Sequence, residues 1–496
     1  MIRGYPAEAI RAAEAPALAA GEPLMLRAAD AVAEAVRLRL AGETDPAVLV
    51  LVGGGNNGGD GLYAAAVLAS VARVSVALAR SDVHAGGLDA ARAAGVEILD
   101  VGADPSGRVL AAAAEDAHVW VDALAGIGVR GALRGAAAEI VEVLTAVADG
   151  APVPPVVIAV DIPSGVDADT GAAAGPVLAA DLTVTFGGAK AGLLLPPGDR
   201  LAGEVQVVAL GLDEDLAAQM PTVSRLLAAD AADLWPVPGF ADHKYTRGVL
   251  GVLAGSAGYP GAAVLCTGGA LRTGCGMVRY LGPERAEQLV LSRWPEVVPG
   301  SGRVQAYVVG PGIGPDDDAR RAEIAATIET AVRDAVGLVV DAGALDLLPP
   351  GEQLAGVRVV LTPHAGELAT LLGARGEQID REAVEQDPRR WAARAAELTG
   401  ATVLLKGATT VVVAPDGETY AQADGTGWLA TAGSGDVLAG ILGALLAGLP
   451  DVSVARVAAL AALVHGRAGR AASNGAPIVA TDVVDALPAT IRALLG

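Results

Sequence analysis

The chain has 496 residues, too many for one hydrophobic core, so its length predicts two or three domains. Hydrophobic residues make up 52% of the sequence and aromatic residues only 3%, a composition typical of an alanine-rich, soluble α/β protein. With 57 acidic and 35 basic residues the formal net charge is −22, which argues against a nucleic-acid-binding surface because such surfaces are basic.

The N-terminus and the cysteines bear on location. The first 23 residues carry acidic side chains early and lack an apolar core, so we expect no secretory signal. We find no uninterrupted apolar run of about 18 residues that predicts a membrane span. Cys266 and Cys275 are expected to be buried or half-buried free thiols, and the five histidines show no metal-ligand spacing. We therefore expect a cytoplasmic protein without nucleic-acid or membrane partners.

The first half of the chain has the pattern of a parallel α/β sheet. A helix is predicted at 24–41, followed by a strand–helix–strand unit at 47–54, 62–72 and 74–79. Later apolar runs predict strands at 119–124, 156–163, 181–187 and 204–211. Asp60, Asp122 and Asp161 are expected at or just beyond strand ends, where open α/β sheets bind ligands.

The strand pattern is lost over residues 212–240, which indicates a domain boundary near 212–225. A second α/β region follows. Its strands are predicted within 249–256, 306–314, 337–345, 357–367 and 401–414, and its last helices around 437–448 and 456–472.

Each half contains one glycine-rich segment with an aspartate at or next to its end, GGGNNGGDG at 53–61 and TGWLATAGSGD at 426–436. Each precedes an alanine-rich run that predicts a helix. Free N–H groups and the helix dipole make such a helix start an anion site. The two segments therefore predict two sites for phosphate-bearing ligands.

The first segment allows more than one interpretation. Gly53, Gly55 and Gly58 satisfy the GxGxxG pattern, and Asp82 has the spacing of a ribose-binding acid, but a tight turn without ligand has the same spacing. The side chains of Asn56, Asn57 and Asp60 add oxygens suited to a cation, a ribose or a phosphate.

Three further loops carry polar residues: Asp122 with Arg130 and Arg134, Asp161 with Ser164, and Lys190. Because successive strand ends of a parallel sheet converge, we expect these loops to form one constellation with the first segment.

The segments GGGNNGGDG, DALAGIG, DIPSGVDADTG and GAKAG together resemble the NAD(P)H-hydrate epimerase domain, over about residues 5–215. The resemblance implies potassium ligands Asn57, Asp122 and Ser164. It implies that Asp161 contacts the substrate, and we expect Asp161 to transfer the proton, because epimerisation at a hydroxyl-bearing carbon next to a ring nitrogen needs acid–base help. The implied substrate-binding residues are Asn56, Asn57, Gly58, Gly59, Asp60, Gly126, Ile127, Gly128, Val129, Arg130, Gly131, Ala132 and Asp161.

The second half carries the segments HKYTRG, GSAGYPGAA, GPGIG, LTPHAGE, KGATT and ATAGSGD. Asp436, at the predicted start of a helix, is either a cap or a base acting on a hydroxyl group. The set resembles the ribokinase-like superfamily, and within it the ADP/ATP-dependent NAD(P)H-hydrate dehydratase, over about 225–496. Ala432 departs from the glycine usual in that family.

This second resemblance implies that Asp436 is the catalytic base, with ADP or ATP as co-substrate and magnesium as a helper. The implied substrate-binding residues are Ala263, Gly312, His364 and Asp436. The implied nucleotide-binding residues are Lys406, Gly407, Ala408, Thr409, Thr410, Gly427, Thr431, Gly433, Ser434 and Gly435.

We thus expect a Rossmann-like three-layer domain at 1–215, a linker at 216–224 and a ribokinase-like α/β domain at 225–496. The expected function is repair of hydrated NADH and NADPH: epimerisation in the first domain and nucleotide-dependent dehydration in the second. A small-molecule kinase fused to a nucleotide-binding regulatory domain is the alternative, and HKYTRG and TPHAGE favour the dehydratase. A non-enzymatic sensing or protein-interaction module is the alternative for the first half. Alanine-rich surfaces suggest a homo-oligomer.

Overall fold

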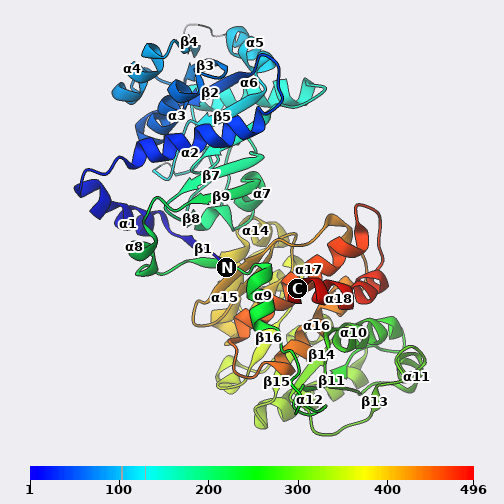
Figure 1. Cartoon of the computed structure of the whole chain (residues 1–496). Helices are drawn as coiled ribbons and strands as arrows, with labels where there is room; N and C mark the ends of the chain where they lie inside the picture. Colours follow the sequence, from blue (N-terminus) through cyan, green and yellow to red (C-terminus); the bar gives the residue numbers. More distant parts are fainter. Residues whose placement is uncertain (102–103, 105, 129) are drawn as a thin grey trace. The chain divides into compact units, whose positions relative to one another are not determined.

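The structure is a computed structural model that describes residues 1–101, 104, 106–128 and 130–496 (Figure 1). The chain forms two compact units. One unit comprises Arg3–Val223, and the other comprises Ser224–Gly496 together with the first two residues. Among the described residues, no helix combines the length and the apolar character that crossing a membrane requires.

The N-terminal unit is built on a seven-stranded parallel sheet with the strand order β4-β3-β2-β5-β6-β7-β9. A short strand β1 pairs in parallel with β8 in the same unit. The strands are β1 (Ile2–Tyr5), β2 (Ala47–Val52), β3 (Arg73–Leu78), β4 (Glu97–Asp100), β5 (Val119–Ala123), β6 (Val156–Val160), β7 (Leu182–Phe186), β8 (Ala189–Lys190) and β9 (Glu204–Val208). The helices are α1 (Ala7–Ala19), α2 (Leu24–Arg39), α3 (Gly55–Leu68), α4 (Ala85–Ala93), α5 (Arg108–Asp116), α6 (Ala136–Gly150), α7 (Gly198–Leu201) and α8 (Asp213–Ala217), with a 3-10 turn η2 (Ala191–Leu193).

Helices cover both faces of this sheet. Alternate residues along β2 point to opposite faces, as the pleat of a strand requires. Val50 packs with α2 and α3, whereas Leu49 and Leu51 pack on the other face with Trp120 and α6. Both faces are buried, which explains why β2 is apolar throughout (AVLVLV) instead of alternating.

The C-terminal unit contains a mixed sheet with the strand order β13-β12-β11-β14-β15-β16-β17-β18-β19-β10. Its pairs are parallel except β17–β18 and β18–β19. The strands are β10 (Val223–Arg225), β11 (Val249–Leu253), β12 (Met277–Tyr280), β13 (Val298–Pro299), β14 (Ala306–Val309), β15 (Gly337–Val340), β16 (Val359–Leu361), β17 (Thr402–Leu405), β18 (Thr410–Val413) and β19 (Thr419–Gln422).

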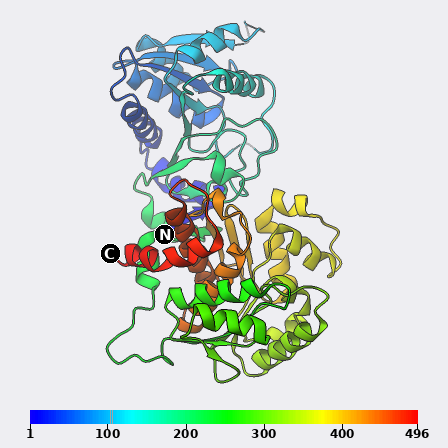
Figure 2. The same cartoon turned by 90° about the vertical axis from the view of Figure 1, so that its right-hand side faces the viewer.

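Helices again form a layer on each face of the sheet. One core joins the sheet to α10, α16, α17 and α18, and a second core joins it to α12, α13 and α15. In Figure 2 the red helices α17 and α18 and the yellow segment α13–α15 lie on different sides of this unit. The helices are α9 (Ala228–Leu234), α10 (Pro260–Thr273), α11 (Glu284–Arg293), α12 (Asp318–Arg333), α13 (Ala365–Gly373), α14 (Arg381–Gln386), α15 (Pro388–Thr399), α16 (Ser434–Gly448), α17 (Val454–Ser473) and α18 (Ala480–Leu495), with 3-10 turns η3 (Ala342–Leu347), η4 (Gly351–Leu354) and η5 (Gly427–Leu429).

Each sheet has one point where the strand order reverses. In the N-terminal unit the chain runs outward through β2, β3 and β4 and then returns to β5 beside β2. In the C-terminal unit β11, β12 and β13 run outward and β14 returns beside β11. Ligands of open α/β sheets bind in the crevice beyond the strand ends at such a point, so each unit offers one predicted site.

The α/β class predicted for both halves is confirmed, and the differences lie at element boundaries. Helix α3 begins at Gly55, inside the glycine-rich segment, although the apolar run predicted a start at residue 62. Helix α16 begins at Ser434, three residues before the predicted start. The run 401–414 forms two antiparallel strands around a turn. The stretch predicted as a linker, 216–224, overlaps the end of α8 and the start of β10.

Candidate active sites

The first site lies at the reversal between β2 and β5. The Gly53 N–H donates to the carbonyl of Ala123 at 3.1 Å, which ties the end of β2 to the end of β5. A Cβ at Gly53 would lie 1.8 Å from the carbonyl oxygen of Leu124, so only glycine permits this approach. The glycine-rich segment therefore brings the start of α3 against the carboxyl end of the neighbouring strand.

Asp122 and Ser164 meet beneath α3. The Ser164 hydroxyl donates to Asp122 Oδ1 at 2.6 Å, and the Ser164 N–H donates to Asp122 Oδ2 at 2.8 Å. Burial raises the pKa of the Asp122 carboxyl, while the bonds from Ser164 act against that shift. Both residues are fully buried, so the oxygens form a rigid polar floor under the site.

Asn57 stands in the first turn of α3, next to the loop that follows Asp122. Its side chain lies against Gly126, where an added Cβ would come within 3.1 Å of it. Both polar atoms of the Asn57 amide are buried and have no hydrogen-bond partner within the described part of the chain. A buried amide without partners is costly, which indicates that a bound group satisfies it.

Asp161 follows β6 in an unusual backbone conformation. Its φ of 69° lies in the left-handed region, which non-glycine residues adopt chiefly at functional or tightly held sites. Its Oδ1 accepts hydrogen bonds from the Thr185 hydroxyl and the Phe186 N–H, both at 3.3 Å, and forms an ion pair with Lys190. The Lys190 side chain is 1% exposed, so this is a buried ion pair.

A cavity of about 550 Å³ opens above these groups, a size within the range of small-molecule sites. Seven of the residues predicted to bind substrate line it: Asn56, Asn57, Asp60, Gly126, Ile127, Gly128 and Asp161. Arg11 and Glu14 of α1 also line it, and the sequence reasoning missed both because they stand in an ordinary amphipathic pattern without a motif.

The remaining predicted residues of this site lie elsewhere. Gly58 and Gly59 are buried inside α3 and do not line the cavity. Arg130 lines a neighbouring cavity of about 410 Å³ and pairs with Asp169 at 3.5 Å. Gly131 adopts a positive φ of 78°, and Ala132 packs near Gly175. Val129 lies outside the described residues.

The second site lies at the reversal between β11 and β14. The Gly255 N–H donates to the carbonyl of Pro311 at 2.8 Å, so the loops after the two strands touch. Gly312 has a φ of 69°, and a Cβ there would lie 2.4 Å from that of Ala262. Ala263 is fully buried, with its methyl group 2.9 Å from where a Cβ of Gly255 would lie. Ala263 and Gly312 are thus brought together at the start of α10.

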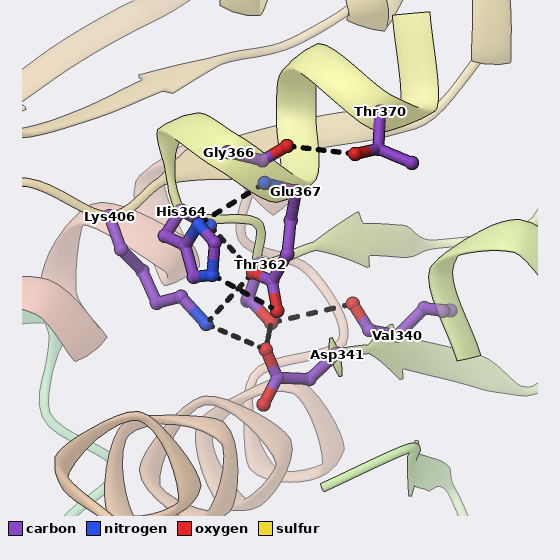
Figure 3. Close-up of polar contacts among 8 residues, drawn as sticks. All are labelled: Val340, Asp341, Thr362, His364, Gly366, Glu367, Thr370 and Lys406. Carbon is purple, nitrogen blue, oxygen red and sulfur yellow. Dashed lines mark hydrogen bonds and ion pairs between the residues drawn. The ribbon is translucent and has the colours of Figure 1, made fainter. Parts of the chain in front are cut away.

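Lys406 is the electrostatic centre of this second site (Figure 3). Its ammonium group lies 2.9 Å from Asp341 Oδ1 and 3.7 Å from Glu367 Oε2. The Thr362 hydroxyl donates to the same Asp341 oxygen at 2.8 Å. Burial acts to lower the pKa of Lys406, but Asp341 and Glu367 outweigh it and the pKa is raised. The lysine therefore stays charged.

His364 is held in place by α13. The Glu367 N–H donates to His364 Nδ1 at 3.1 Å, and the His364 N–H donates to Glu367 Oε2 at 2.8 Å (Figure 3). These reciprocal bonds form a capping box at the helix start. The Lys406 N–H donates to the carbonyl of Pro363 at 2.8 Å, so His364 and Lys406 lie on adjacent loops. The His364 side chain is 60% exposed and available to a ligand.

The anion loop lies against Lys406. Gly433 caps α16 with a φ of 86°, and a Cβ at Gly435 would lie 3.5 Å from the Lys406 ammonium. Ser434 Oγ lies 3.2 Å from Nε2 of His465, a buried residue of α17. Burial, and then the charge of Asp341, raise the pKa of Asp436 to about 7, while Lys406 acts to lower it.

The other predicted nucleotide residues occupy two turns. Gly407, Ala408 and Thr409 lie in the connection between β17 and β18, and Thr410 begins β18. Gly427 and Thr431 lie on either side of the end of η5. Sequence reasoning missed Asp341 and His465. Asp341 stood within an apolar strand-like run, and only its place directly after a strand could have indicated a role. Within the described residues, no group of three or more His, Cys, Asp or Glu side chains is placed to hold a metal ion.

Comparisons with known proteins match a different family on each half of the chain. The family described as YjeF-related protein N-terminus matches residues 21–192, and the family described as NAD(P)H-hydrate dehydratase matches residues 250–489. The chain is 43% identical over 465 residues, or 90% of each chain, to the bifunctional NAD(P)H-hydrate repair enzyme Nnr of Mycobacterium tuberculosis. The chain belongs to the family of bifunctional NAD(P)H-hydrate repair enzymes.

Other relatives match one half of the chain. The NAD(P)H-hydrate epimerase of Microbacterium testaceum is 47% identical over 226 residues, which cover 45% of this chain and 84% of that protein. A crystal structure of the ADP/ATP-dependent NAD(P)H-hydrate dehydratase of Bacillus subtilis is 26% identical and covers 55% of this chain and 99% of its own, with a TM-score of 0.49. Membership of the repair-enzyme family favours two enzymatic domains over a fused small-molecule kinase or a non-enzymatic first domain.

Proposed function

We propose that the N-terminal unit interconverts the two epimers of hydrated NADH and NADPH, and that the C-terminal unit dehydrates the S epimer with ADP or ATP. The observation that carries this proposal is the pair of reversal-point sites, each with a catalytic-type aspartate, in one chain of the repair-enzyme family. The free thiols Cys266 and Cys275 support a reducing, cytoplasmic location for both reactions.

In the epimerase site we propose that Asp161 transfers the proton. Its carboxylate lines the cavity, and the ion pair with the buried Lys190 holds it in place. The backbone of Gly126 to Gly128 and the side chain of Asn56 line the same cavity and would hold the dinucleotide. Arg130 lines the adjoining cavity, together with Arg11, and extends the proposed site.

The potassium site fits the residues that the structure brings together. The unpartnered amide of Asn57 and the buried oxygens of Asp122 and Ser164 are the donor types that hard cations prefer. Potassium bound there would offset the charge of Asp122 and give the Asn57 carbonyl oxygen a partner. The residues' own role is to fix the first turn of α3, from which Asn56 reaches the cavity.

In the dehydratase site we propose that Asp436 takes the proton from the substrate's ring hydroxyl. The freed oxygen attacks the terminal phosphoryl group of the nucleotide, and the phosphate ester then leaves as inorganic phosphate while a ring proton is lost, which restores the reduced nicotinamide. Lys406 and the N–H groups of Gly433 to Gly435 are placed to stabilise the transferring phosphoryl group. Ala263, Gly312 and His364 would position the hydrated ring.

Magnesium and the nucleotide have chemically suitable neighbours. Magnesium in proteins is held by one or two carboxylates together with substrate phosphates. Glu367 and Asp341 offer such carboxylates beside Lys406. The ion would supply charge neutralisation on the phosphates, while Lys406 to Thr410 and the 427–435 segment hold the nucleotide.

One assay tests both activities. The protein is given a mixture of hydrated NADH epimers with ADP or ATP, and recovery of the reduced-nicotinamide absorbance is followed. We expect complete recovery from the wild-type chain. Asp161→Ala should stall after one epimer is consumed, apart from spontaneous conversion, and Asp436→Ala should abolish recovery.

The exposed Asp334→Asn is the matched control and should behave as the wild type. Recovery of both epimers at the wild-type rate by Asp161→Ala would exclude the role given to Asp161. Absence of any nucleotide-dependent recovery in the wild type would exclude the proposed function.

A further inference from the structure

The epimerase cavity collects three carboxyl groups around one ammonium group. Asp60 of α3, Glu14 of α1 and Asp161 after β6 all line it, and Lys190 lies directly behind Asp161. Asp60 and Asp161 are each 8% exposed, and Glu14 is half-buried. Three acids and one base in a confined volume cannot all ionise without strong repulsion, so the cluster must retain a proton.

Lys190 has no N–H group left to donate to Asp60 or Glu14. An ammonium group has three N–H donors. Those of Lys190 reach Asp161 Oδ1, the Thr185 hydroxyl at 3.1 Å and the Phe186 carbonyl at 2.8 Å. Its capacity is therefore used up, and Asp161 is the carboxylate with which it pairs.

Asp60 and Glu14 have no such partner. In the part of the chain that the structure describes, neither forms an ion pair, and the Arg11 guanidinium on α1 donates to the carbonyl of Ile127 at 3.0 Å instead. Burial, and then the charges of Asp161 and Glu14, raise the pKa of Asp60 to about 8, with Lys190 acting against them. Burial also raises the pKa of Glu14.

The other titratable neighbour of this part of α3 is His84. It lies over Gly59, where an added Cβ would come within 3.1 Å of the imidazole, and its Nδ1 accepts the Gly87 N–H at 3.0 Å. His84 is thus engaged at the start of α4. The charged groups that act on Asp60 are accordingly Asp161 after β6, Glu14 on α1 and Lys190 on β8, whereas Arg11 acts on Glu14.

We propose that Asp60 is a second catalytic residue of the epimerase, the acid that protonates the departing hydroxyl, and that Glu14 is a positioning residue that keeps the proton on Asp60. The inference rests on the proposed epimerase function. A carboxyl held neutral beside one held ionised is the usual arrangement for paired acid and base roles.

The Asp60 proton passes to the hydroxyl on the ring carbon, the C–O bond breaks, and water leaves as the ring nitrogen's electron pair forms a C=N⁺ bond. Water then adds to the other face of that carbon, and the Asp161 carboxylate takes its proton. Transfer of that proton to Asp60 resets the site, and in the reverse direction the two acids exchange roles.

The test uses the full chain without nucleotide, so that the dehydratase is silent. A single purified epimer of hydrated NADH is supplied, and the appearance of the other epimer is followed by chromatography, with the spontaneous rate subtracted. We expect Asp60→Asn to lower kcat about 100-fold or more while KM changes little, the size of effect typical of a lost acid. Asp30→Asn, at an exposed carboxyl of α2, is the matched control and should leave both constants unchanged.

The pH profile separates this role from a merely structural one. In the wild type, kcat/KM should fall as the pH rises through about 8, where Asp60 loses its proton in the free enzyme. Glu14→Gln removes a like charge, so the alkaline limb should move to lower pH, by an amount of order one unit.

Two results would overturn the inference while leaving the epimerase function standing: an Asp60→Asn chain as fast as the wild type, or a Glu14→Gln profile superimposable on that of the wild type. A wild-type chain that does not interconvert the epimers would instead overturn the proposed function itself.

Discussion

Asp161 and Asp436, the two residues given catalytic roles, have opposite surroundings. Asp161 shares a buried ion pair with Lys190, whereas Asp436 lies near the negative charge of Asp341 with Lys406 only partly offsetting it. The first carboxyl thus has a buried cationic partner, whereas the pKa of the second is raised to about 7. This difference leads to two predictions at the scale of single residues.

The dehydratase should gain activity with rising pH. A base works only when ionised, so kcat/KM should rise as the pH rises through about 7, where Asp436 loses its proton in the free enzyme. Asp341→Asn removes the charge that raises this pKa and should move the rising limb to lower pH. Initial rates with ADP across the pH range measure the position of this limb. Asp346→Asn changes a more exposed carboxyl and is the control, which should leave the limb in place. A limb that stays in place in Asp341→Asn would contradict this account of Asp436.

Lys190 should be essential to the stability of the N-terminal unit. Lys190→Met leaves the Asp161 carboxylate buried without its cation, a loss of about 3–5 kcal/mol in the free energy of unfolding. Denaturant unfolding of the full chain measures the loss. The double variant Lys190→Met with Asp161→Asn removes the uncompensated charge and should recover much of it. A double variant no more stable than the single one would show that the cost arises from packing.

At the scale of elements, close helix contacts depend on glycine. Helices α10 and α16 approach so closely that a Cβ at Gly440 would lie 2.0 Å from the carbonyl oxygen of Cys266. Backbone atoms at that distance cannot move aside cheaply, so the helices would have to separate.

Gly440→Ala should therefore lower the free energy of unfolding of the C-terminal unit by about 1–3 kcal/mol, despite the better helix propensity of alanine. Thermal unfolding followed by circular dichroism measures the change. Gly261→Ala in α10 is the control, because nothing lies within 4 Å of a Cβ there, and it should be neutral or slightly stabilising. Equal stability of the two variants would contradict the steric explanation.

The elements also show what a sequence can and cannot reveal. Strands such as β2 and β5 were predictable because buried parallel strands are continuous apolar runs bounded by polar or glycine residues. The start of α3 was misplaced because six of its first seven residues are glycine or asparagine, which have low helix propensity, and tertiary contacts override that propensity.

The candidate sites were predictable where a motif marked them. Asp122 and Ser164 are hydrogen-bonded to each other, and the Asn57 amide is buried without a partner among the described residues, but their role as potassium ligands stays a prediction. Glu14 and Arg11 lie on a plain amphipathic helix, and Asp341 ends an apolar run. These residues belong to the candidate sites because of the loops that the fold brings together, and the local sequence pattern does not indicate which loops meet.

At the scale of the whole molecule, each unit has its own cores, so ligands should stabilise the units separately. We expect two calorimetric transitions. ADP with magnesium should raise the temperature of one transition, and potassium in place of sodium should raise that of the other. At a hundredfold excess over Kd, each ligand should add about 2.7 kcal/mol to the free energy of unfolding of its unit.

Asn57→Ala should abolish the potassium shift and leave the ADP shift intact, because the amide without partners is the proposed ligand. A potassium shift that survives in Asn57→Ala would place the ion elsewhere. A single transition raised by either ligand would contradict independent stabilisation of the two units.

Cys266 offers a way to time the opening of the C-terminal unit. Its thiol is 0% exposed on α10, facing the close contact with α16, and burial together with the charges of Asp436 and Asp341 raises its pKa. A thiol-modifying reagent can therefore reach it only when α10 parts from α16. In a Cys275→Ser background, the rate at which Cys266 is labelled would measure how often these openings occur. Because the anion loop begins α16, bound nucleotide should make them rarer, so that a single buried sulfur reports occupancy of the dehydratase site without any turnover.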